Sequence, residues 1–300
     1  MTACDTNDFP YEPAPTPASA ELRDVWDAAI GLQETDGLKP SAYLRATADE
    51  TVAGTMPFAA ATAAVRTYYR ERDAEKTASD QEEREADLVS CRIAELLARR
   101  GFFLAPTMLF SIHRYLFQDL DDATYAPGRP KTEALAKKET ILNGDSVLYG
   151  APEFIDGALK LFFDREATRA YSAAMAPDEL RGFCEFITHI WQVHPFKEGN
   201  TRTVAVFSAL YLDYLGFDTS NEPFARHARY FRDALVRANY RNAKADVMPD
   251  LAFLVRFYEN MLHDAGHALR SKDLVCPALF ERPELLRNMP AAEALTKPEQ

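Results

Sequence analysis

The sequence contains few glycines and few cysteines, with 12 and four respectively among 300 residues. Alternating apolar and polar runs, which are typical of half-buried strands, are also rare. This balance predicts an all-α fold. The hydrophobic content of 47%, which includes 19 Phe and 13 Tyr, is sufficient for a sizeable core.

The cysteines are too widely spaced to form a zinc-binding motif, and they are Cys4, Cys91, Cys184 and Cys276. The N-terminus lacks the basic start and apolar run of a signal peptide. No apolar stretch approaches the length of a membrane span. We therefore expect a cytoplasmic protein with no membrane partner.

The chain has no excess of positive charge, since its formal net charge is -12. An acidic chain repels phosphate backbones, which argues against general binding to nucleic acids. The net charge still permits a local basic site for a single nucleotide.

The proline and charge distribution suggests four regions. Residues 1–20 carry four prolines and are expected to form a flexible arm, and residues 21–100 form an N-terminal helical region. The main domain covers residues 105–265, and residues 266–300 form a peripheral tail. Apolar spacing in the main domain predicts helices near residues 106–116, 152–165, 177–193, 201–215, 224–240 and 249–268.

The clearest β signal is an Asn-Gly pair between two short apolar runs. Asn143-Gly144 favours a tight turn, and apolar residues precede and follow it. We therefore expect a small hairpin formed by Leu142, Asn143, Gly144, Asp145, Ser146, Val147 and Leu148.

A polar loop of nine residues separates two apolar helices and reads His194-Pro195-Phe196-Lys197-Glu198-Gly199-Asn200-Thr201-Arg202. Packing of a core does not require this set of side chains. A neutral imidazole at His194 can take a proton from a hydroxyl near pH 7. Glu198 can hold a hard cation such as Mg²⁺.

The start of the second helix is a candidate anion site. Gly199 allows close approach of a ligand to the backbone, and Asn200 is a suitable N-cap. Free backbone amides at a helix N-terminus bind phosphate. Arg202 lies in the first turn, where a cation is unfavourable against the helix dipole unless an anion is bound nearby.

This loop resembles the signature of the Fic (fido) family, HPF-x-(D/E)-GN-x-R-x-x-R, over residues 194–202. The resemblance extends over about residues 105–265 and implies the Fic-type helical core. It also implies that the predicted hairpin is the family's flap, which pairs with the target segment through Leu142, Asn143, Gly144, Asp145, Ser146 and Val147.

The resemblance implies transfer of AMP from ATP to a Tyr, Thr or Ser hydroxyl of a target protein. His194 would deprotonate the hydroxyl, and Glu198 would hold Mg²⁺. The residues assigned to the nucleotide are Phe196, Lys197, Glu198, Gly199, Asn200, Thr201 and Arg202. A homo-oligomer remains open.

The sequence departs from the family pattern at three positions. Thr201 replaces the usual glycine, and Ala205 replaces a second arginine that would meet the terminal phosphate. An inhibitory helix of many members has its nearest counterpart at residues 47–54, where Ala53 takes the position of the glutamate. Glu50 and Glu83 are weaker candidates for that glutamate.

Two other functions are compatible with the same loop. One is transfer of a different phosphate-containing group, although kinase-like members carry lysine where Thr201 stands. The other is a weakly active nucleotide-binding protein of toxin-like or regulatory type. The absence of the second arginine, at Ala205, favours this function.

Overall fold

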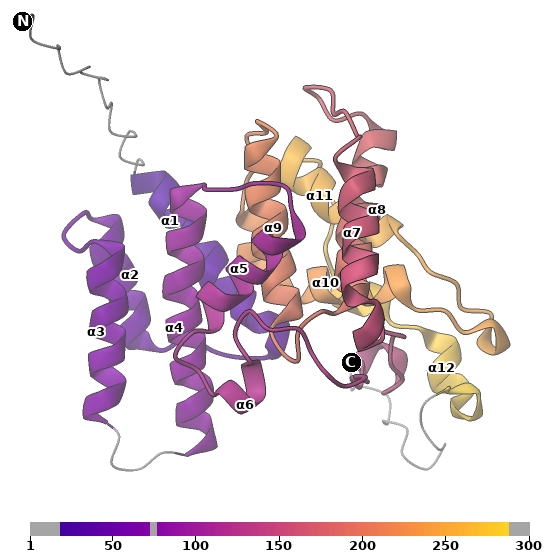
Figure 1. The fold of residues 1–300 in the computed structure, drawn as a ribbon, viewed down its shortest axis with the longest axis horizontal. Helices are drawn as coiled ribbons and strands as arrows, with labels where there is room; N and C mark the ends of the chain where they lie inside the picture. The colour runs from indigo at the N-terminus through magenta and orange to yellow at the C-terminus, as the bar shows by residue number, and fades with distance from the viewer. Residues whose placement is uncertain (1–18, 73–76, 288–300) are drawn as a thin grey trace, which may run out of the picture.

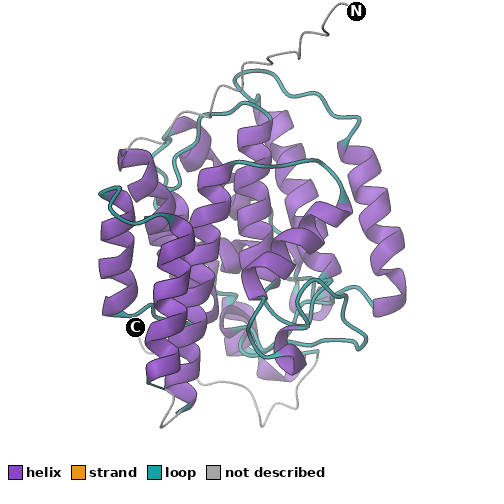
Figure 2. Cartoon of the chain, turned by 60° about the vertical axis from the view of Figure 1, so that its left-hand side comes forward, coloured by secondary structure: helices purple, strands orange, loops and turns teal. Residues whose placement is uncertain are grey.

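The computed structural model describes residues 19–72 and 77–287, which form helices joined by loops (Figures 1 and 2). Within these residues there is no strand, and β-type pairing is limited to one isolated bridge between Asn242 and Val247. The predicted all-α fold is therefore confirmed. Across the described ranges, no helix is long and apolar enough to cross a membrane.

The N-terminal region consists of α1 (Ser19–Gly31), the 3₁₀ turn η1 (Leu32–Asp36), α2 (Ala42–Val52), α3 (Phe58–Glu71) and α4 (Ala78–Arg99). Helix α1 packs against α4 and α10, so this region shares one core with the rest of the chain. Ser41 caps α2 by accepting a hydrogen bond from the Leu44 amide at 3.0 Å. The predicted flexible arm lies almost wholly outside the described residues.

Helix α9 is buried from Asn200 to Leu212 and packs against α4, α5 and α8. In Figure 1, α9 and α10 lie between the N-terminal helices and the pair α7 and α8. The bounds are α5 (Pro106–Phe117), α6 (Asp122–Tyr125), α7 (Ile155–Glu166), α8 (Pro177–Val193), α9 (Asn200–Tyr214), α10 (Glu222–Asn239), α11 (Ala252–His263) and α12 (Pro277–Glu281), with 3₁₀ turns η2 (Thr140–Leu142), η3 (Pro152–Phe154), η4 (Ala243–Ala245), η5 (Ser271–Leu274) and η6 (Pro283–Leu285). The predicted helices of the main domain are confirmed to within a few residues.

The predicted hairpin is wrong. Asn143 and Gly144 do adopt the positive φ angles of 54° and 84° that a tight turn uses. The turn, however, follows the 3₁₀ segment Thr140–Leu142 and leads into an extended segment that pairs with no strand. Residues 141–147 are all buried, because this segment packs into the core instead of extending from it.

The C-terminal segment holds this loop in place, so its described part is not peripheral. The Asn143 side chain donates to the Leu279 carbonyl at 2.9 Å, and the Cys276 amide donates to the Ile141 carbonyl at 3.0 Å. Leu274 and Leu279 are fully buried. These contacts fill the space that a projecting hairpin would have left open.

Candidate active site

The polar loop lies between α8 and α9, and positive φ angles at two residues set its path. Helix α8 ends at Val193, and His194 follows with φ 50°. Pro195 disfavours helical geometry at the residue before it, which explains the end of the helix. Gly199 has φ 74° and begins α9. The loop therefore turns sharply at each end and directs the His194 side chain inward.

The imidazole of His194 is buried and 2% exposed. It stacks on Tyr149 with ring centroids 3.9 Å apart and meets Trp191 edge-on at 5.6 Å. Neither ring nitrogen has a hydrogen-bond partner in the described parts of the chain. Burial, reinforced by the nearby charges of Lys137 and Lys131, lowers the pKa of His194 well below its ordinary value. The imidazole is therefore neutral near pH 7 and has a free lone pair.

A second histidine, His113 on α5, holds the backbone of the loop in place. Nδ1 of His113 accepts a hydrogen bond from the Gly128 amide at 2.9 Å, so the proton lies on Nε2, which donates to the Glu198 carbonyl at 3.0 Å. Its ring stacks on Phe196 at 3.7 Å. Burial lowers the pKa of His113 to about 3. His113 therefore positions the backbone of the loop.

Gly199 and Asn200 close the loop by different means from those expected. A Cβ atom on Gly199 would lie 2.2 Å from Phe117, so no other residue fits there without displacement. The N-cap of α9 is Gly199, and the prediction of Asn200 as the N-cap is wrong. The Asn200 side chain instead bonds the backbone of Phe196, accepting from its amide at 3.0 Å and donating to its carbonyl at 2.7 Å.

The side chain of Thr201 provides a hydrogen-bond acceptor that glycine lacks. Its hydroxyl accepts a hydrogen bond from Nε1 of Trp191 at 3.1 Å. Trp191 is buried, so its N–H group would otherwise lack an acceptor. The threonine at this position therefore links α9 to the aromatic wall beside His194.

Glu198 lies at the rim of the site and forms an ion pair with Lys137 at 2.7 Å. The carboxylate is 36% exposed, and hard cations such as Mg²⁺ take one or two carboxylates together with substrate phosphates. In the described ranges, no cluster of three or more His, Cys, Asp or Glu side chains could hold a metal ion alone. The donor set therefore fits a cation that a bound phosphate completes.

Arg202 is paired with protein carboxylates. Its guanidinium is 1% exposed and lies 2.7 Å from both Asp36 and Glu85, while Gln33 accepts a third contact at 3.0 Å. Burial would lower the pKa of Arg202, but the two carboxylates outweigh this effect and raise it. The charge that suggested a phosphate is thus balanced within the fold. Glu83, a candidate inhibitory residue, instead accepts from Tyr69 at 3.1 Å.

The cavity at the loop measures only about 10 Å³. This volume accommodates about one water molecule, so a nucleotide can enter only after side chains move. The lining combines loop residues with side chains from three distant segments, and comprises Asp36, Lys137, Glu139, Tyr149, Trp191, His194, Gly199, Asn200, Thr201 and Arg232. The structure therefore represents a closed form of the site.

Several predicted residues lie away from this cavity. Phe196 is buried against Phe110 and His113, and the Lys197 amino group donates to the Ala123 carbonyl at 2.6 Å. The residues assigned to a target-binding flap, from Leu142 to Val147, are buried and cannot pair with another chain in this form. Leu148 is the neighbour that is exposed, at 63%.

Sequence reasoning missed the lining residues outside the loop. Glu139 is 1% exposed and pairs with Arg232 at 2.9 Å, and burial raises the pKa of Glu139. Asp36, Lys137 and Arg232 belong to separate segments with no shared motif. The one available signal was the polar stretch around Lys137 immediately before the Asn-Gly turn.

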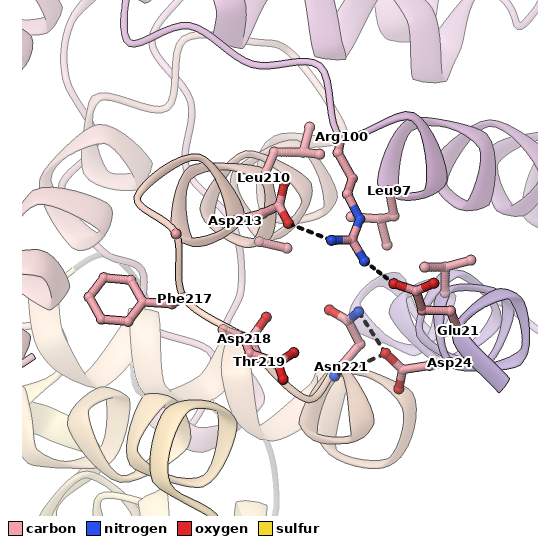
Figure 3. A pocket seen from close by; sticks show the side chains of 13 residues that line it. Glu21, Asp24, Leu97, Arg100, Leu210, Asp213, Phe217, Asp218, Thr219 and Asn221 are labelled. Carbon is pink, nitrogen blue, oxygen red and sulfur yellow. Dashed lines mark hydrogen bonds and ion pairs between the residues drawn. The ribbon is translucent and has the colours of Figure 1, made fainter. Parts of the chain in front are cut away.

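A larger hollow of about 380 Å³ lies between α1, α4 and the end of α9 (Figure 3). Arg100 pairs there with Glu21 and with Asp213, the latter at 3.0 Å. The side-chain amide of Asn221 donates to the Asp24 carboxylate at 2.8 Å. Carboxylates dominate this lining and would repel phosphate groups, so the hollow is a poor candidate for a nucleotide.

Comparison with known proteins identifies the loop and the helices around it. Residues 103–212 match the sequence model of the Fic/DOC family. Over these residues the chain is similar to Fic domains. The motif loop, α5, α8 and most of α9 lie within the matched range, whereas the cavity residues Asp36 and Arg232 lie outside it.

A curated relative is the probable protein adenylyltransferase y4lH of Sinorhizobium fredii, which is 27% identical over 130 residues. The match covers 43% of this chain and 62% of the relative's length.

Two solved structures of Fic proteins are also similar. One is a Fic-domain-containing signalling protein from Bacteroides thetaiotaomicron, with 14% identity, coverage of 87% and 91% of the two chains, and a TM-score of 0.46. The other is a Fic family protein from Desulfovibrio desulfuricans, with 14% identity, coverage of 85% and 77%, and a TM-score of 0.43.

Proposed function

We propose that this chain transfers AMP from ATP to the hydroxyl group of a Tyr, Thr or Ser side chain in a target protein. The observation that carries the proposal is His194, a buried neutral imidazole whose two nitrogens have no partner among residues 19–72 and 77–287. The name of the curated relative, a probable protein adenylyltransferase, supports the same reaction.

The residues divide the chemistry among them. His194 takes the proton of the target hydroxyl as its oxygen attacks the α-phosphorus of ATP, and the bond between that phosphorus and the bridging oxygen of pyrophosphate breaks. The amides at the start of α9, from Asn200 onward, face the phosphates with the positive end of the helix dipole. Glu198 is the residue that would hold Mg²⁺, which supplies charge neutralisation of the phosphates.

A second candidate is a nucleotide-binding protein with weak activity. Two observations favour it: the cavity measures only about 10 Å³, and Ala205 contributes no charge. Transfer of another phosphate-containing group is the third candidate. We expect the AMP reaction because the imidazole is poised as a base, a feature that simple binding does not need. A cytoplasmic location stays a prediction.

The position of the label in ATP distinguishes these functions. The full chain is incubated with Mg²⁺, a cell lysate and ATP labelled on either the α- or the γ-phosphate. We expect protein labelling from the α-phosphate alone. Labelling from the γ-phosphate would indicate a kinase, and ATP binding without any labelling would indicate the weakly active alternative.

The state of His194 should be visible in its titration. Because the folded-state pKa lies well below the ordinary 6.5, His194 should remain neutral as the pH falls through 6.5. Nuclear magnetic resonance of ¹⁵N-labelled imidazoles reports this directly, and the same histidine in urea should titrate near ~6.5. The acid limb of kcat/KM for labelling should correspondingly lie below pH 6.5. A His194 resonance that titrates normally in the folded chain would contradict the assignment of a buried base.

A further inference from the structure

The terminal phosphates of a nucleotide in this site need a positively charged partner. Ala205 lies about one helical turn after Arg202, is fully buried, and supplies no charge. The positive charges near the cavity belong to Lys131, Lys137, Arg202 and Arg232. These four side chains differ in burial and in the ion pairs that they would have to break to reach a phosphate.

Arg202 is committed to its present contacts. Asp36 and Glu85 each lie 2.7 Å from its guanidinium, and these carboxylates are only 26% and 15% exposed. Movement of Arg202 toward a phosphate would leave two largely desolvated carboxylates without a partner, which is strongly unfavourable. Arg202 therefore stays where it is.

Arg232 is held by an ion pair, and Lys131 lies outside the cavity lining. Arg232 neutralises Glu139, which is 1% exposed and would become an unpaired buried charge if the arginine left. Lys131 has no carboxylate partner among the described residues, but it is 5% exposed, lies 3.4 Å from the Val193 carbonyl and does not line the cavity. Arg232 therefore cannot turn toward a phosphate at low cost, and Lys131 does not reach the cavity in this structure.

Lys137 differs because its partner is the candidate metal ligand. Its ammonium lies 2.7 Å from Glu198, and the two side chains are 25% and 36% exposed, so separating them leaves both in contact with water. The Lys137 amide donates to Oγ of Ser146 at 3.1 Å, which fixes the backbone while the side chain remains free to rotate.

We propose that Lys137 binds the terminal phosphates of the nucleotide and thereby supplies the charge that Ala205 lacks. This inference rests on the proposed function. In this structure, the ammonium of Lys137 forms an ion pair with the Glu198 carboxylate. When Glu198 holds Mg²⁺, the ammonium loses the Glu198 ion pair and lies beside the cavity where the phosphates must enter.

The test is the binding of ATP and AMP to the full chain by calorimetry with Mg²⁺ present. Lys137→Met should weaken ATP binding by about tenfold or more, which corresponds to loss of one charge-assisted contact. The affinity for AMP should change by less than about twofold, since AMP has no terminal phosphates. Lys137→Arg should retain ATP binding, and Lys137→Gln provides a second neutral variant.

Lys138→Met is the matched control, because Lys138 is the adjacent exposed lysine and does not line the cavity. It should bind ATP as the unmodified chain does. Equal losses for ATP and AMP in Lys137→Met, or no loss for either, would overturn the inference while leaving AMP transfer intact. If the unmodified chain binds no ATP, the inference and the proposed function both fail.

Discussion

His194→Ala is expected to reduce AMP transfer by roughly 100- to 10,000-fold, the usual contribution of a general base. The imidazole of His194 lines the cavity, and its ring nitrogens have no hydrogen-bond partner among the described residues. Alanine has no group that could accept a proton in its place. Binding of ATP should survive, because the amides at the start of α9 and the side chain of Glu198 are unchanged. The rate is measured with α-labelled ATP at saturating concentration.

His189→Ala is the matched control for this loss. His189 lies on the same helix, α8, and stacks on Phe162 at 4.8 Å, away from the cavity. We expect its transfer rate to stay within about twofold of that of the unmodified chain, since His189 does not line the cavity. Equal rates for His194→Ala and the unmodified chain would remove the general base from the mechanism.

Gly199→Ala is expected to lower the free energy of unfolding by about 2–5 kcal/mol and to disturb the site. Two costs combine: a non-glycine residue at φ 74° costs ~1–2 kcal/mol, and the new Cβ, 2.2 Å from the Phe117 ring, adds roughly 1–3 kcal/mol of overpacking. Urea denaturation followed by circular dichroism measures the difference.

Gly54→Ala separates these two costs. Gly54 has the same φ of 74°, but no atom lies within 4 Å of a Cβ built there. It should therefore show the conformational cost alone, about 1–2 kcal/mol. If both variants lost the same amount, close packing of the loop against Phe117 would not contribute to stability.

The sequence predicted the helices well because their apolar residues recur at helical spacing. Helices α8 and α9 carry that pattern on both sides of the loop, and the structure places them at residues 177–193 and 200–214. The hairpin failed because its turn signal is local. Asn143 and Gly144 do make the turn, but contacts with Leu279 and Cys276, more than a hundred residues away, determine what the flanking residues do.

The site was predictable where one short motif carries it and unpredictable where distant segments meet. His194, Glu198 and Gly199 follow from the loop alone. The loop does not predict the more distant residues Asp36, Lys137 and Arg232. Their ion pairs join residues more than sixty positions apart, and such pairs leave no local sequence pattern. Arg202 does have anionic partners, as its place in the first helical turn predicts, but the fold supplies them from Asp36 and Glu85.

The most direct measurement of the central claim is mass spectrometry of the proteins labelled in the lysate reaction. We predict a peptide that carries one AMP group on a Tyr, Thr or Ser hydroxyl, and that is missing when His194→Ala replaces the unmodified chain. A peptide that carries phosphate alone, or an AMP adduct formed equally by both chains, would contradict AMP transfer by His194.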